Sequence, residues 1–148
     1  MGVVEYSIWI NAVPEQVWNT YVDPARLPAW QTGKPVISQL HGAPGEAGST
    51  YVSKRGPLSA RTTVLSTDAS RELVTRTDAY FGLQFEVTSR LKRRSGGTEL
   101  QLRAETRWRH RLGPVAKIVE LAILSPAEAR KELANLKVLV EGTPSTGV

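Results

Sequence analysis

The sequence predicts an α+β domain in which a seven-stranded antiparallel sheet comes first and a long C-terminal helix last. Apolar and polar residues alternate from Val4 to Ile10 and again over most of residues 35–108, which is the two-residue period of strands. Two glycines at 96–97 separate the two longest alternating segments, as in a tight hairpin. After residue 114 the apolar spacing becomes helical.

The first strand, residues 4–10, is followed by two short helices that begin with proline. Pro14 fits the first turn of one helix, although Val13 before it is a poor cap. Asp23 and Pro24 supply a cap and a first helical residue for the other, and Pro28 keeps that helix short. We expect the remaining strands at residues 35–40, 50–55, 60–67, 72–79, 83–94 and 98–108.

A register can be predicted for the last hairpin. If Gly96 and Gly97 form a two-residue turn, Ser95 faces Thr98. Charged residues then pair on one face and apolar residues on the other. The pairs would be Arg94 with Glu99, Leu91 with Leu102, Glu86 with Arg107 and Phe85 with Trp108, and one like-charged pair would form, Arg90 with Arg103.

The C-terminal helix carries two apolar stripes separated by the sequence SPAE. Ser125 can cap a helix and Pro126 can begin it, so we expect a kink or a new helix there. Gly142 ends the helix, which gives one domain over residues 1–142 and a flexible tail at 143–148. The stripes are Val115, Ile118, Val119, Ala122 and Ile123, and then Ala129, Leu133, Leu136 and Val140.

The composition excludes several classes of protein. The 148 residues include no cysteine, which excludes disulfides and thiolate metal sites and suggests a reducing cytoplasm. The two histidines, His41 and His110, do not indicate a metal centre, and we predict no metal and no cofactor. No apolar run is long enough to span a membrane, and the N-terminus does not resemble a signal peptide. We therefore expect a soluble, cytoplasmic protein.

The net charge of +5 does not by itself identify a partner. We find no nucleic-acid-binding motif and do not expect nucleic acid as a partner. The basic segments 92–94 and 107–111 would lie at opposite ends of the last hairpin, so a solvated surface is the simplest interpretation. Peripheral contact with an anionic membrane stays an alternative. Both a monomer and a homodimer are compatible with the sequence.

Three segments in this order resemble the START/SRPBCC superfamily, also called Bet v 1-like or helix-grip. They are IWINAVPEQVWNTYVDPARLPAW at residues 8–30, LKRRSGGTELQLRAE at 91–105 and EARKELANLKVLVEG at 128–142. The chain is most similar to the polyketide cyclase/dehydrase and lipid-transport branch. The resemblance implies that the two short helices support one end of a curved sheet, whose concave face the long helix covers. Trp18 would fill the core, and Trp30 would lie where a cavity begins.

The resemblance also implies a cavity for an apolar molecule between the sheet and the long helix. Four side chains near its rim have acid–base or anion-binding capacity: Tyr51, Arg55, Tyr80 and His110. We use the strand alternation and the helical stripes to predict which residues face the cavity. They are Trp30, Tyr51, Thr62, Val64, Leu73, Thr75, Phe85, Val87, Leu102, Thr106 and Trp108, together with Ile118, Ala122, Ala129 and Leu133 of the helix.

Three functions are compatible with this pattern. The first is binding of a hydrophobic small molecule, such as a lipid or a polyketide-like aromatic compound. The second is a polyketide cyclase, aromatase or dehydrase that acts in the same cavity, although no catalytic residue can be assigned from the sequence. The third is a protein-interaction module similar to the chaperone activators of the superfamily. The glycine-rich segment 42–48 lacks a phosphate-binding pattern and is predicted to be a turn.

Overall fold

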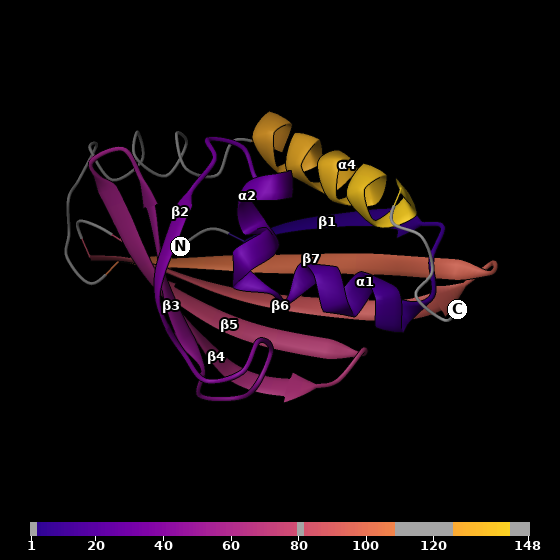
Figure 1. Cartoon of the computed structure of the whole chain (residues 1–148), viewed down its shortest axis with the longest axis horizontal. Helices are drawn as coiled ribbons and strands as arrows, with labels where there is room; N and C mark the ends of the chain where they lie inside the picture. The colour runs from indigo at the N-terminus through magenta and orange to yellow at the C-terminus, as the bar shows by residue number, and fades with distance from the viewer. Residues whose placement is uncertain (1–2, 80–81, 109–125, 143–148) are drawn as a thin grey trace.

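The computed structural model describes residues 3–79, 82–108 and 126–142 (Figure 1). Seven strands form one sheet in the order β1-β7-β6-β5-β4-β3-β2, and every neighbouring pair is antiparallel. No strand boundary differs from the predicted one by more than two residues, so the predicted fold is confirmed. The strands are β1 Val3–Ile10, β2 Val36–His41, β3 Thr50–Arg55, β4 Leu58–Asp68, β5 Glu72–Asp78, β6 Leu83–Arg94 and β7 Gly97–Trp108.

Two short helical arms follow β1, as the prolines predicted. They are α1 (Pro14–Tyr21) and a single 3-10 turn, η1 (Pro24–Arg26), that continues into α2 (Leu27–Trp30). The Asp23 carboxylate caps η1 by accepting a hydrogen bond from the Ala25 amide at 3.0 Å. Val13 offers α1 no such bond, so α1 depends on the packing of its buried face.

The described part of the long helix α4 spans Pro126–Gly142, and it ends at Gly142 as the sequence predicted. The first apolar stripe and the expected kink lie outside the described residues. Figure 1 shows α4 lying beside β1 across one face of the sheet. Its C-terminal end is fixed to the end of β1, because Lys137 Nζ donates to the Trp9 carbonyl at 3.0 Å and Glu141 accepts from the Asn11 amide at 2.9 Å.

The register predicted for the last hairpin is wrong by two residues. The turn is formed by Ser95 and Gly96, whose φ angles of 51° and 78° suit a primed two-residue turn. Arg94 therefore pairs with Gly97. The other pairs shift likewise, to Leu91 with Leu100, Glu86 with Glu105, Phe85 with Thr106, Leu83 with Trp108, and Arg90 with Gln101 in place of Arg103. A shift of two leaves every side chain on its predicted face.

Gly97 is glycine for a different reason from the one that we predicted. A Cβ atom at this position would lie 2.4 Å from the Ile10 carbonyl oxygen and 2.7 Å from the Trp9 ring. Both distances are far shorter than van der Waals contact. The glycine thus lets β7 approach the end of β1, and the glycine pair in the sequence is one turn residue followed by one packing residue.

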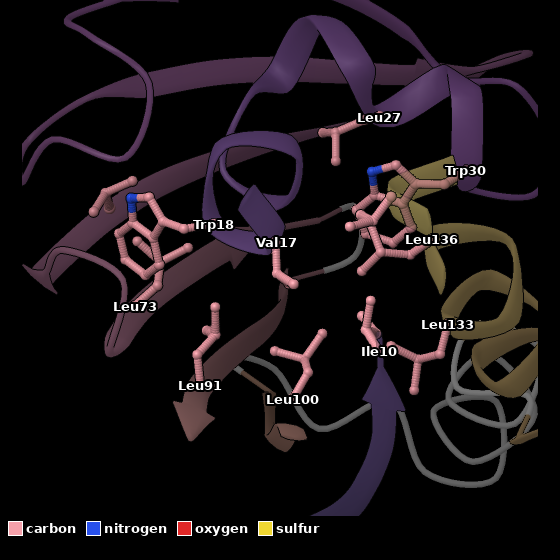
Figure 2. Close-up of a cluster of buried hydrophobic side chains, with 12 residues drawn as sticks. Ile10, Val17, Trp18, Leu27, Trp30, Leu73, Leu91, Leu100, Leu133 and Leu136 are labelled. Atoms are coloured by element: carbon pink, nitrogen blue, oxygen red, sulfur yellow. The ribbon is translucent and has the colours of Figure 1, made fainter. Parts of the chain in front are cut away.

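One end of the inner sheet face is filled by a hydrophobic core, which we call the core end. Leu73, Leu91 and Leu100 point from the sheet toward Trp18 of α1 and Leu136 of α4, and all five are buried. Figure 2 shows these side chains gathered between the strands and the helices. Apolar burial of this kind is the main source of folding free energy, so the core end holds the helical arms and α4 on the sheet.

Candidate functional site

The other end of the inner face holds a pocket with a volume of about 310 Å³, which we call the pocket end. Strands β3 to β7 supply most of its wall, and α2, α4 and the two residues that directly follow α2 and β5 supply the rest. The described lining residues are Leu27, Gln31, Tyr51, Ser53, Arg55, Leu58, Ser59, Ala60, Thr62, Thr77, Ala79, Phe85, Val87, Ala104 and Glu132. The wall is therefore apolar and hydroxyl-bearing, with one acidic and one basic side chain.

The strand register sets the order of the side chains across the pocket wall. Tyr51, Thr62, Thr77 and Phe85 are consecutive cross-strand partners on β3, β4, β5 and β6. The hydroxyls of Thr62 and Thr77 lie 2.8 Å apart and share a hydrogen bond. The two threonines of this row occupy less space than leucines would, so the sheet leaves room for a pocket beside them.

Glu132 of α4 and Arg55 of β3 form a polar cluster at the edge of the pocket. The Glu132 Oε2 atom accepts hydrogen bonds from the Thr32 amide at 2.9 Å and the Thr32 hydroxyl at 3.3 Å. It also accepts from Arg55 Nη2 at 3.5 Å, and the same guanidinium nitrogen donates to Gln31 Oε1 at 3.2 Å. The cluster joins three segments that are far apart in the sequence.

Burial changes the protonation chemistry of the pocket. It raises the pKa of the Glu132 carboxyl, although the hydrogen bonds from Thr32 and the charge of Arg55 act in the opposite direction. Burial also raises the pKa of the Tyr51 hydroxyl, against a hydrogen bond with the Thr62 side chain. Tyr51 therefore stays neutral at physiological pH, and Glu132 takes up a proton more readily than an exposed glutamate does.

Tyr21 and Trp30 belong to the hydrophobic core and its edge rather than to the pocket lining. Their rings stack with centroids 5.8 Å apart, and the Tyr21 hydroxyl hydrogen-bonds Ser89 Oγ at 2.7 Å. Burial raises the pKa of Tyr21 to about 12, with a further contribution from the nearby Tyr51 and Glu132. The indole N–H of Trp30 is buried without a hydrogen-bond partner. In Figure 2 the Trp30 nitrogen lies on the side of the ring nearer Leu27, which lines the pocket.

The predicted site residues fall into three groups. Tyr51, Thr62, Phe85 and Val87 line the pocket. The side chain of Trp108 and all of Ile118 and Ala122 lie outside the described residues. The others do not line the pocket: Trp30, Val64, Leu73 and Leu133 belong to the core, Leu102 packs against it, Thr106 is buried, and Thr75 and Ala129 are partly buried.

Sequence reasoning missed several lining residues. Thr77 and Ala104 share the strand alternation of the predicted positions, so continuing the pattern would have found them. Glu132 was missed because we predicted the inward face of the helix from its apolar residues alone. A glutamate beside that stripe is usually exposed to solvent. Arg55 was placed at the rim by the sequence and does line the pocket. Tyr80 and His110, the other rim residues, lie outside the described residues along with part of segment 107–111.

A larger hollow of about 560 Å³ lies mainly on the outer face of β1, β6 and β7. Its polar side chains pair with one another or with neighbouring strands, as Arg90 does with Glu72 at 2.9 Å and Arg103 with Glu105 at 2.8 Å. Exposed pairs of this kind contribute little energy and are strongly solvated. We therefore regard the pocket on the inner face as the candidate site.

Comparison with solved structures agrees with this architecture. A protein from Rhodobacter sphaeroides is 22% identical, with a TM-score of 0.73 over 95% of this chain and 93% of its own. DynU16, a protein of the dynemicin biosynthetic locus, is 21% identical, with a TM-score of 0.69 over 96% of this chain and 48% of its own. The Bet v 1-like protein Ara h 8.0201 is 12% identical, with a TM-score of 0.70 over 96% and 99%. These likenesses establish the helix-grip fold.

Comparison with curated protein sequences finds no match. Within the described segments, no helix combines the length and the apolar character needed to cross a membrane. The family model described as polyketide cyclase/dehydrase and lipid transport matches residues 1–141, almost the whole chain. The chain therefore belongs to this family, within the SRPBCC superfamily.

Proposed function

We propose that the protein binds a hydrophobic small molecule in the pocket between the sheet and α4. The pocket itself is the observation that carries the proposal. It has apolar walls from Leu27, Phe85 and Val87 and a few polar groups placed among them, which is the usual make-up of a small-molecule site. Its volume of about 310 Å³ is near the lower end of the range of roughly 300–1,000 Å³ for such sites, which favours a compact ligand over a two-chain lipid.

A neutral fluorescent probe, N-phenyl-1-naphthylamine, tests this proposal. The wild-type protein should bind it saturably, with one site and an increase in fluorescence. Ala104→Phe should abolish this binding, because Ala104 lines the pocket opposite Val87 on the neighbouring strand and a phenyl ring would occupy the space. The matched control is Thr88→Phe on the outer face of β6, which should leave the affinity unchanged. Equal affinities for all three proteins would place the probe elsewhere and contradict the proposal.

Glu132 favours a second candidate function, an enzyme of the cyclase or dehydrase type. Such chemistry begins with removal of a proton next to a carbonyl group, which needs a positioned base whose pKa lies closer to neutral than that of a free carboxylate. Glu132 has a raised pKa and lines the pocket together with the hydroxyls of Thr62 and Thr77. Those hydroxyls could stabilise an enolate oxygen by hydrogen bonding.

Deuterium exchange separates the two functions. With 2-tetralone in D₂O, an enzyme of this type would accelerate exchange at the carbon between the ring and the carbonyl, measured by proton NMR. Glu132→Gln would remove the acceleration, whereas Glu15→Gln, an exposed change in the first turn of α1, would retain it. Exchange at the buffer rate in the presence of a bound ketone would support binding without catalysis.

A further inference from the structure

The hydrogen-bonding capacity of the pocket wall is only partly used, and this bears on the class of ligand. In the Thr62–Thr77 pair one hydroxyl donates to the other, so the hydrogen of the accepting hydroxyl is left for a third oxygen. That third oxygen is either Tyr51, the next residue in the row, or an atom of a ligand. The sheet side of the pocket thus offers hydroxyls that adapt to a donor or to an acceptor.

The helix side of the pocket offers an acceptor. Among the described residues, the Glu132 carboxylate accepts three hydrogen bonds, and all of them go to Oε2, from the Thr32 amide, the Thr32 hydroxyl and Arg55. They fix the orientation of the side chain, and no described residue donates to Oε1, which lies in a partly buried place with its lone pairs available. A hydrogen bond to an ionised group is stronger than one between neutral groups. A ligand group that donates to Oε1 would therefore contribute more binding free energy than one that bonds to a neutral hydroxyl of the wall.

The same geometry disfavours an anionic ligand. A second carboxylate in the pocket would lie close to Glu132, and like charges in a partly buried site repel. Arg55 is the basic residue among the described lining residues, and its Nη2 is already shared between Glu132 and Gln31. A carboxylate ligand would therefore have to compete with the existing partners of Arg55 for the one positive charge.

We propose that the pocket selects a neutral, compact, apolar ring compound that bears a phenol or enol hydroxyl, and that this hydroxyl donates its hydrogen bond to Glu132 Oε1. The inference rests on the proposed binding function and narrows its ligand class. Glu132 is then a specificity-determining residue, held by Thr32 and Arg55. Free fatty acids and other carboxylates fall outside the class.

Three naphthalenes that differ in a single substituent test this inference: 2-naphthol, its methyl ether 2-methoxynaphthalene, and 2-naphthoate. Their affinities are measured at pH 7 by displacement of N-phenyl-1-naphthylamine from the full chain. Wild-type protein should bind 2-naphthol about tenfold more tightly than the methyl ether, which is the effect of one hydrogen bond to a charged group. It should bind 2-naphthoate most weakly of the three.

Glu132→Gln should reduce the preference for 2-naphthol to about twofold, because the acceptor loses its charge. The same variant should bind 2-naphthoate more tightly than wild-type protein does, whereas a role confined to folding would change all three affinities together. Glu15→Gln, an exposed change on α1, should keep the wild-type pattern. Unchanged affinity for the methyl ether shows that the pocket of Glu132→Gln is intact.

The outcomes separate this inference from the function on which it rests. Equal wild-type affinities for 2-naphthol and its methyl ether, with saturable binding of both, would overturn the ligand class and leave small-molecule binding in place. No displacement of the probe by any of the three compounds, together with no binding of the probe itself, would instead count against the binding function. The wild-type comparison decides the question even if Glu132→Gln does not fold.

Discussion

The two ends of the inner sheet face are formed largely by the same strands but carry different side chains. At the core end the strands present leucines such as Leu91 and Leu100, which are buried with Trp18 in one hydrophobic cluster. At the pocket end the equivalent inward positions carry Thr62, Thr77 and Ala104, and a pocket remains. One antiparallel sheet thus supplies both a packed core and a pocket, because side-chain volume changes along the strands while the ladder of hydrogen bonds continues.

The comparison predicts its largest effect at the core end. Leu136→Ala should lower the free energy of unfolding by about 2–5 kcal/mol, because this side chain of α4 is fully buried and its loss leaves a cavity. Val138→Ala, two residues on, removes a side chain that is 72% exposed and should change it by less than about 0.5 kcal/mol. Urea denaturation at pH 7 measures both. Equal losses would mean that the face of α4 turned to the sheet is assigned incorrectly.

A second prediction concerns the close approach of β7 to the end of β1. Gly97→Ala should cost about 1–3 kcal/mol, because the added methyl group would overlap the Ile10 carbonyl and the Trp9 ring. Gly142→Ala is the control, since a Cβ atom there would meet nothing within 4 Å. Thermal unfolding followed by circular dichroism gives both values. If Gly97→Ala is as stable as the control, the register of the last hairpin needs revision.

At the pocket end a change of three wall residues should have little effect on stability. The triple variant Tyr51→Phe/Thr62→Val/Thr77→Val removes the Thr62–Thr77 hydrogen bond together with the Tyr51 hydroxyl that bonds Thr62, and it keeps the shape, so no hydroxyl of this row is left unpaired. We expect the free energy of unfolding to change by less than about 1 kcal/mol. A loss as large as that of Leu136→Ala, measured in the same urea titration, would show that the pocket wall is part of the folding core.

The smallest expected effect is a pH dependence that arises from Glu132. Its pKa is raised in the folded protein, so in the range between the ordinary glutamate pKa and this raised value the folded state binds more protons than the unfolded state. The contribution of this group to stability therefore falls as the pH rises through that range. The difference in Tm between wild type and Glu132→Gln should shift in favour of wild type when the pH is lowered from 7 to 5. A shift in the opposite direction would mean that the pKa is lowered.

The sequence predicted the elements of the fold well because their signals are local. Alternation marked the strands to within two residues, and Pro14, Pro24 and Gly142 marked helix ends. The hairpin register was wrong because the turn needs one glycine and the second glycine serves packing against Ile10, which no local pattern reveals.

The candidate site was predicted less completely. Strand alternation placed Tyr51, Thr62, Phe85 and Val87 on the correct face, but it does not say where along the strands the core stops and the pocket begins. That boundary depends on which side chains the helices bring to the sheet. The contact of Glu132 with Thr32 joins residues 100 positions apart, so it appears only in the folded chain.

The central claim is that a largely apolar pocket at one end of the sheet binds a small molecule, with Glu132 at its edge. Crystallography with a heavy-atom ligand tests this claim most directly. Crystals soaked with 6-bromo-2-naphthol should give an anomalous bromine peak inside the pocket bounded by Leu27, Phe85 and Val87, with the hydroxyl oxygen within hydrogen-bonding distance of Glu132 Oε1. A bromine peak only at the outer surface, or an empty pocket at saturating ligand, would contradict the account.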